Sequence, residues 1–301
     1  MRDAMDVNGD EAPQTVDTQT AETQTVETGH FGTVPVRHRD CPLCGQAHGT
    51  GLATGYAHGP WTVRQCPGCG FVYIDKAPHY EVQFDTMAWE RTTTVEDQRR
   101  AEIRPISYKA SKRTRFRLHL LPKRTMLGYI AARIEAGRVL DLGCGDGHAM
   151  GDFPPAFTPF GIEISSKLAA GANRSFSARG GHAINAPCVE GLRQFPEGFF
   201  AAASLRSYLE HETNPLPVLE NLHRALAPGG FAVVKVPNYA SLNRMVMGSR
   251  WCGFRYPDHL NYFTPATLRA MAGKAGFETS FGLTGQLPTS DNMWAVLTKR
   301  G

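Results

Sequence analysis

The chain has 301 residues, of which 42% are hydrophobic and 20% are charged, and its formal net charge at pH 7 is +4. These fractions are ordinary for a soluble protein, and the small positive charge does not by itself indicate a nucleic-acid partner. The sequence contains neither an apolar run of the roughly 20 residues that a membrane-spanning helix needs nor a basic segment followed by an apolar leader. We therefore expect no membrane span and a cytoplasmic location.

Residues 1–36 are rich in Thr, Gln, Glu and Asp and contain few large apolar side chains. A segment of this composition buries too little apolar surface to offset the entropy lost on ordering. We expect it to be a disordered acidic tail.

Residues 37–78 contain two Cys-x-x-Cys pairs of the same design, each followed by glycine. The four thiols are Cys41, Cys44, Cys66 and Cys69. Two such pairs facing each other form a tetrahedral sulfur site that suits Zn²⁺, and four protein ligands leave no open position for catalysis. The pattern predicts a zinc-ribbon-like module with a structural zinc ion, and a redox role for the pairs is the alternative.

Residues 79–137 are expected to form a helical, basic connecting region. Its cations are Arg99, Arg100, Arg104, Lys109, Lys112, Arg113, Arg115, Arg117, Lys123 and Arg124. A basic run of this kind is typically a solvated helix face. The alternative is that it contacts phosphate groups, either of RNA or of a nucleotide-linked substrate.

From residue 138 to 301 strand-like and helix-like segments alternate, which predicts an α/β domain with a mostly parallel sheet. The expected strands are 139–142, 160–164, 183–185, 201–205, 231–236, 279–283 and 294–298. The expected helices are 166–179, 217–226 and 265–275.

A glycine-rich turn, Asp141-Leu142-Gly143-Cys144-Gly145-Asp146-Gly147, follows the first of these strands. Glycines after a strand let the backbone approach a ligand closely. The spacing differs from the dinucleotide fingerprint G-x-G-x-x-G, because His148 stands where the last glycine of that motif would be.

The turn resembles the D-x-G-x-G-x-G loop of class I S-adenosylmethionine (SAM)-dependent methyltransferases. Further segments in the same order are similar to that family: Tyr208-Leu209-Glu210-His211, Leu226-Ala227-Pro228-Gly229-Gly230, and His259-Leu260-Asn261-Tyr262-Phe263-Thr264. The resemblance implies a Rossmann-like seven-stranded sheet and SAM as the methyl donor. It implies a donor site made of Asp141, Gly143, Cys144, Gly145, Gly147 and Glu163, with Glu163 binding the ribose hydroxyls.

The four-cysteine module ahead of this domain resembles bacterial methyltransferases that act on nucleotide-linked sugars and on secondary-metabolite or polysaccharide precursors. In the sugar C-methyltransferases a Tyr-His-Glu-His segment supplies acid and base, and the aligned residues are Tyr256-Pro257-Asp258-His259. Because two of the four residues differ, methylation of oxygen or nitrogen stays as open as methylation of carbon.

Three residues are candidates for catalysis. His259 is the first candidate base because it lies in the long segment after the fifth strand, which can fold over the strand ends where ligands bind. His211 follows the fourth strand directly and is the second candidate, and Tyr256 can orient the acceptor. Structural roles for both histidines, in helix capping or in tying loops together, are the alternatives.

We therefore expect a methyltransferase that uses SAM and acts on a small acceptor, such as a phosphorylated or nucleotide-linked compound. The alternative is an RNA methyltransferase that holds nucleic acid with its zinc module and basic region. A non-catalytic SAM-binding scaffold is the third hypothesis.

Overall fold

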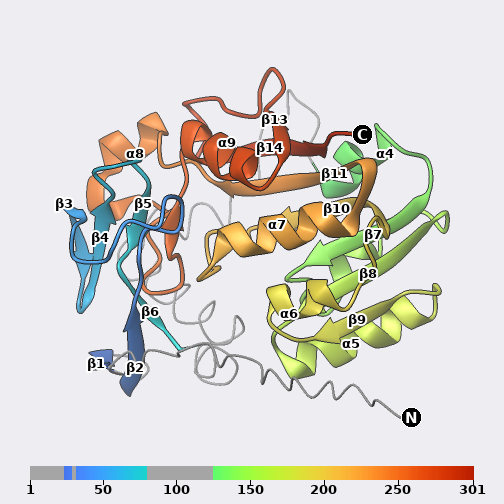
Figure 1. Ribbon diagram of the computed structural model, residues 1–301, viewed down its shortest axis with the longest axis horizontal. Coiled ribbons are helices and arrows are strands. Elements are labelled where there is room, and N and C mark those ends of the chain that lie inside the picture. The colour runs from blue at the N-terminus through green and yellow to red at the C-terminus, as the bar shows by residue number, and fades with distance from the viewer. Residues whose placement is uncertain (1–23, 29–31, 80–124) are drawn as a thin grey trace, which may run out of the picture.

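The computed structural model describes residues 24–28, 32–79 and 125–301. These residues form a seven-stranded sheet with helices on both faces, and two smaller sheets stand beside it (Figure 1). The tail before residue 24 and residues 80–124, which include all the cations of the predicted basic run, lie outside the described residues. None of the described helices is long and apolar enough to cross a membrane.

The large sheet has the strand order β13-β14-β11-β10-β7-β8-β9. Its strands are β7 (Gly137–Leu142), β8 (Phe157–Glu163), β9 (His182–Asn185), β10 (Phe200–Arg206), β11 (Leu226–Pro237), β13 (Phe277–Ser280) and β14 (Asn292–Lys299). Strand β14 runs opposite to the other strands and pairs antiparallel with both β11 and β13. The seven predicted strands and the predicted hairpin at one edge are confirmed.

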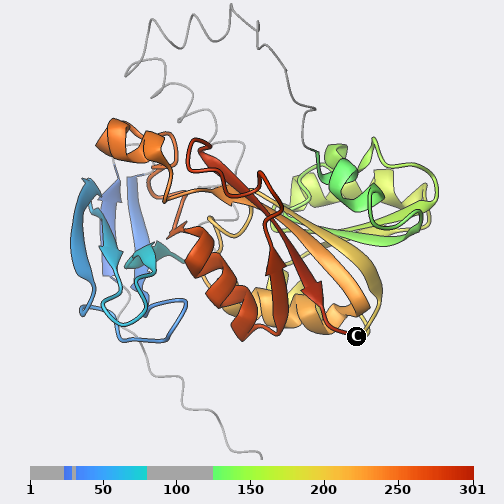
Figure 2. The ribbon, with the colours of Figure 1, turned by 90° about the horizontal axis from the view of Figure 1, so that it is seen from above.

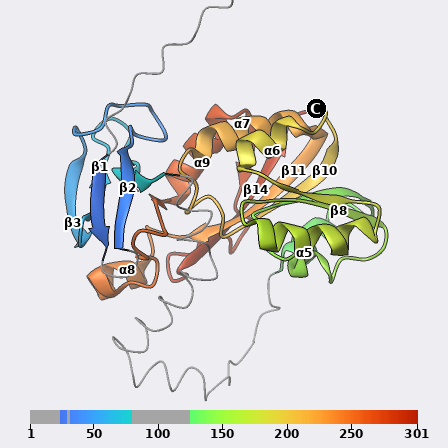
Figure 3. The same cartoon turned by 90° about the horizontal axis from the view of Figure 1, so that it is seen from below.

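Helices cover both faces of this sheet because its strands are apolar on both sides. In β7, Val139 belongs to the core on one face, whereas Leu140 belongs to the core on the other, as the two-residue period of a strand requires. The helices α6 (Cys188–Arg193), α7 (Pro215–Ala225) and α9 (Pro265–Lys274) cover one face, and α4 (Met126–Ala131) and α5 (Ser166–Ser177) cover the other (Figure 3). Helix α6 is absent from the expected elements.

The prediction of disorder up to residue 36 is wrong for the part of this segment that the structure describes. Strands β1 (Gln24–Thr28) and β2 (Gly32–His38) form an antiparallel hairpin, and β2 pairs with β6 (Lys76–Pro78). Val34 and Val36 of β2 are buried, and the β-branched residues of the hairpin favour strands. Two buried valines and pairing with β6 stabilise a segment whose composition is otherwise polar.

The strands on either side of the second Cys-x-x-Cys turn belong to a second small sheet, which also includes a strand from much later in the chain. Its order is β12-β5-β4-β3, with β3 (Leu52–His58), β4 (Trp61–Gln65), β5 (Val72–Ile74) and β12 (Asn261–Tyr262). We call residues 32–78 the N-terminal module. Short helices α8 (Leu242–Met247) and η2 (Gly248–Arg250) precede β12 and lie against this module (Figure 2), and η1 (His148–Met150) follows the glycine turn.

Candidate active site

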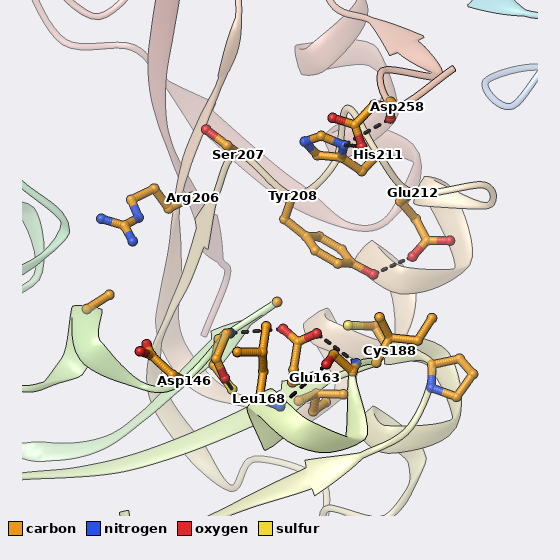
Figure 4. Close-up of a pocket in the computed structure, with 18 of the residues that line it drawn as sticks. Asp146, Glu163, Leu168, Cys188, Arg206, Ser207, Tyr208, His211, Glu212 and Asp258 are labelled. Carbon is orange, nitrogen blue, oxygen red and sulfur yellow. Dashed lines mark hydrogen bonds and ion pairs between the residues drawn. The ribbon is translucent and has the colours of Figure 1, made fainter. Parts of the chain in front are cut away.

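A cavity of about 720 Å³ opens at the carboxyl ends of β7, β8, β10 and β11. The turns after β7 and β10 both border it, and these neighbouring strands lie where the order of the sheet reverses. Ligands of open α/β sheets bind at this kind of position because the two loops leave the sheet in opposite directions. Figure 4 shows the side chains that line the cavity.

The glycine turn forms one wall of the cavity, and its three glycines all have positive φ: 68° at Gly143, 56° at Gly145 and 82° at Gly147. A Cβ atom on Gly143 would lie 2.8 Å from the Tyr208 ring, and one on Gly147 would lie 2.8 Å from the Phe176 ring. On Gly145 a Cβ atom would meet no protein atom within 4 Å, and this residue lines the cavity. The outer glycines therefore permit close packing, whereas the middle one presents bare backbone to a ligand.

Glu163, at the end of β8, is hydrogen-bonded to the glycine turn. Its carboxylate accepts hydrogen bonds from the backbone N–H of Gly145 and of Ser165, each at 2.9 Å. The side chain lines the cavity although the residue is only 9% exposed. The acid is thus held at the point where the resemblance places a residue that binds ribose.

Two of the residues expected at the donor site do not line the cavity. Asp141 is buried and accepts a hydrogen bond from the Ser204 hydroxyl at 2.7 Å, which ties β7 to β10. Burial raises the pKa of the Asp141 carboxyl to about 6, although the Ser204 bond opposes the shift. Gly147 packs behind the turn, against Phe176. Cys144 does line the cavity, and burial raises the pKa of its thiol.

The opposite end of the cavity is polar and is built by residues from two segments. Nδ1 of His211 lies 2.9 Å from the carbonyl oxygen of Asp258 and 3.1 Å from its carboxylate oxygen Oδ1 (Figure 4). Arg255 forms an ion pair with the same carboxylate at 3.0 Å. Burial alone would lower the pKa of His211, but the negative charge of Asp258 raises it to about 9.

His259 and Tyr256, the other two catalytic candidates, are not among the residues that line the cavity. Nδ1 of His259 lies 2.8 Å from the Gly253 carbonyl oxygen, and its ring meets the His211 ring edge-on with centroids 4.7 Å apart. Burial holds the pKa of His259 well below its usual value. The Tyr256 ring stacks on Phe254 at 5.9 Å. Of the three candidates, the structure places His211 at the cavity and His259 directly behind it.

A family model described as "Methyltransferase domain" matches residues 110–280, more than half of the chain. The chain belongs to this methyltransferase family. No curated protein matches the sequence.

Solved structures with a similar fold include three SAM-dependent methyltransferases. One from Archaeoglobus fulgidus is 17% identical, covering 57% of this chain and 90% of that chain, with a TM-score of 0.44. One from Thermotoga maritima is 18% identical, covering 58% and 88%, with a TM-score of 0.44. One from Methanosarcina mazei is 15% identical, covering 59% and 99%, with a TM-score of 0.45. The family assignment rests on the domain match, which identifies the protein as a methyltransferase.

Sequence reasoning missed two cations of the methyltransferase cavity. Arg206 ends β10 and Lys235 lies near the end of β11, and both line the cavity. Neither forms an ion pair with an acidic side chain within the described ranges 24–28, 32–79 and 125–301. Their position at the carboxyl ends of parallel strands is the sequence feature that could have indicated a place in the cavity.

Outside the cavity, the four cysteines of the methyltransferase come together as the sequence predicts. The Sγ atoms of Cys41 and Cys69 are 3.5 Å apart, as are those of Cys44 and Cys66, and all four lie within 4.8 Å of one another. Each pair forms the same turn, in which the following glycine donates its N–H to the first cysteine's carbonyl. These glycines have φ of 75° (Gly45) and 71° (Gly70), a left-handed conformation that glycine adopts without strain.

The module is attached to the wall of the cavity. Its strand β5 pairs with β12, which directly follows the segment containing Asp258 and His259. Pro78, the last residue of β6, lines the cavity itself. The position of the polar end therefore depends on the cysteine-containing module.

Proposed function

We propose that this methyltransferase transfers the methyl group of SAM to an oxygen of a small acceptor that bears phosphate or carboxylate, such as a nucleotide-linked sugar or a related precursor. The observation that supports this most strongly is that one cavity joins a glycine-and-acid cradle at one end to a cluster of charged side chains at the other. Tyr208 lies between the two ends (Figure 4).

The residues at the first end fit the donor. Gly145 presents backbone without a Cβ atom, and Glu163 offers a fixed carboxylate to hydroxyl groups. Leu168, Ala186 and Pro187 add an apolar surface beside them that suits a purine ring. When bound here, SAM supplies an electrophilic methyl group, so the protein chiefly has to align the acceptor with it.

The cations that border the cavity support an anionic acceptor. Arg206, Lys235 and Arg255 all border the cavity, and only Arg255 is ion-paired with a described acid. Arginine and lysine side chains inside a cavity attract phosphate and carboxylate groups and fix their orientation. In this arrangement the cations hold the acidic group of the acceptor, and its nucleophile lies near His211.

We also propose that Cys41, Cys44, Cys66 and Cys69 bind one structural Zn²⁺ ion. Thiolates on two equivalent turns, with Sγ atoms 3.5 Å apart across the turns, match a tetrahedral sulfur site. The four thiols leave no place for a substrate, so the ion would stabilise the module and not take part in methyl transfer.

The RNA alternative depends on the basic run, which lies outside the described residues, and it stays a prediction. A single experiment tests both hypotheses: calorimetric titration with S-adenosylhomocysteine, followed by nucleotide sugars, simpler sugar phosphates and a short RNA. We expect micromolar binding of S-adenosylhomocysteine, and weaker binding of the anionic acceptor in Arg206→Gln by about tenfold or more. Binding of RNA alone, with a steep salt dependence, would contradict the small-acceptor proposal.

A further inference from the structure

We propose that Glu210, His211 and His259 bind a divalent transition-metal ion at the polar end of the cavity, separate from the four-cysteine site. One carboxylate oxygen of Glu210 and one ring nitrogen of each histidine all lie within 4.8 Å of one another. This inference rests on the proposed function, because it assigns the group that activates the acceptor.

Among these three residues, Glu210 has a buried carboxylate oxygen that a bound cation would neutralise. It is 1% exposed, and its Oε2 atom is buried without a hydrogen-bond partner among the residues that the structure describes. A buried carboxylate oxygen is costly unless it meets a donor or a cation. The backbone fixes this residue in place, because its carbonyl oxygen accepts the N–H groups of Leu260 and Asn261 at 2.7 and 3.0 Å.

Both histidines direct Nδ1 at a backbone carbonyl oxygen, which leaves Nε2 as the ring nitrogen that can bind a metal. Nδ1 of His211 lies 2.9 Å from the carbonyl oxygen of Asp258, and Nδ1 of His259 lies 2.8 Å from the carbonyl oxygen of Gly253. A carbonyl oxygen only accepts hydrogen bonds, so each Nδ1 is a donor, and a metal bound at Nε2 of His211 takes the place of the proton there. Metal-binding histidines are typically oriented by such hydrogen bonds from their second ring nitrogen.

Two imidazoles and one carboxylate form a ligand set for Zn²⁺, Mn²⁺ or Fe²⁺, and three protein ligands leave coordination positions open. His211 lines the cavity, so an ion bound to it borders the space for the acceptor. The four-cysteine site differs in kind, because its four thiolates complete a tetrahedron and it lies in the N-terminal module.

The ion's role follows from this position. It binds the acceptor's hydroxyl oxygen and lowers the pKa of that hydroxyl, and the proton leaves to solvent. The oxygen then forms a bond to the methyl carbon while the carbon–sulfur bond of SAM breaks. The products are the methyl ether, S-adenosylhomocysteine and one proton.

The test is a Mn²⁺ titration of the full-length protein with its cysteine site already filled by zinc, followed by electron paramagnetic resonance of free Mn²⁺. Mn²⁺ is used because thiolates bind it poorly, so the titration reports a site of nitrogen and oxygen ligands. We expect one Mn²⁺ per chain. Glu210→Gln, which keeps the size of the side chain, should weaken binding by about 100-fold, and His259→Gln should do the same.

Glu212→Gln is the matched control, since Glu212 is a buried carboxylate two residues away that is outside the cluster and is hydrogen-bonded to Asn214. Its Mn²⁺ affinity should equal that of the wild type. No binding to the wild type at millimolar Mn²⁺, or an equal loss in Glu212→Gln, would overturn the assignment. Titration of the same samples with S-adenosylhomocysteine separates the two proposals, because a protein that binds this product but no Mn²⁺ refutes only the metal site.

Discussion

Arg39, at the start of the N-terminal module, donates a hydrogen bond from Nη2 to Oδ1 of Asn261 at 2.8 Å, across 222 residues of sequence. The same guanidinium donates to the carbonyl oxygens of Thr213 and Ile74. Asn261 in turn donates to the carbonyl oxygens of Leu209 and Glu212, at 2.8 and 2.6 Å. One buried cation thus joins the module to the turn that holds Glu210 and His211.

Replacing Arg39 with methionine should therefore destabilise the whole protein. Several buried carbonyl oxygens would lose their donor, so we expect the free energy of unfolding to fall by about 2–4 kcal/mol. Urea denaturation measures this. Arg300→Met is the control, because both side chains of the Arg300–Glu278 ion pair are exposed, at 76% and 57%, and the pair should contribute about 1 kcal/mol or less. Equal losses in the two variants would show that the Arg39 bonds have no special role.

Substitution of Cys41 with serine should abolish zinc binding at the proposed four-cysteine site. Removing one thiolate from a four-thiolate site leaves it incomplete, and the binding energy of such an ion stabilises the fold. Zinc content after dialysis against a chelator should fall from one ion per chain to none. Cys252→Ser is the control, since this exposed cysteine lies outside the cluster. If the Cys41 variant kept its zinc, the assignment of the four thiolates would be wrong.

Substitution of Gly145 with alanine should weaken donor binding by at least about tenfold. The residue has φ of 56°, and its new methyl group would occupy the cavity. Gly180→Ala is a matched control, because Gly180 also has positive φ, 78°, and open space around a Cβ atom, but it is not among the residues lining the cavity. Both variants should lose about 1–2 kcal/mol of stability from backbone strain. Calorimetry with S-adenosylhomocysteine should separate them, and equal affinities would refute the donor site.

The buried Asp141 carboxyl predicts a specific dependence of stability on pH. Its pKa is about 6 in the folded protein, against about 4 in an unfolded chain. The folded state therefore holds this proton more tightly, and the contribution to stability is complete below pH ~4 and is lost as pH rises to ~6. The loss amounts to about 3 kcal/mol.

Asp141→Asn removes this titration while keeping a group that can accept the Ser204 hydrogen bond. Urea denaturation at several pH values should show the wild type losing stability relative to the asparagine variant between pH ~4 and ~6, with no further change above. Other titrating groups are present in both proteins and cancel in the comparison. Two parallel curves would mean that Asp141 is not buried in the way the structure shows.

Much of the large sheet is predictable from the sequence, because its strands are short apolar runs separated by glycine and proline. The turn glycines are predictable too, since only glycine adopts their backbone conformation without strain. The β1–β2 hairpin is not predictable in this way, because its stability depends on contacts between Val34, Val36 and residues some 40 positions later.

In the candidate site, too, some positions are predictable from local sequence and others depend on distant contacts. Glu163 lines the cavity as its place at a strand end predicts. His211 lines the cavity and His259 lies behind it because of how the segment before β12 folds back. No local sequence pattern encodes that path. Asp141 belongs to the most informative motif, yet its side chain bonds a neighbouring strand because it lies within β7, opposite Ser204 in the register with β10.

The pairing of β12 with β5 has a consequence for synthesis of the chain. Strand β5 emerges from the ribosome early, but its partner begins only at residue 261. Until then the N-terminal module exposes a strand edge with free backbone donors and acceptors, which is a template for pairing with other chains. Fragments that end before β12 should therefore associate with one another, and the module depends on the last part of the chain to cover that edge.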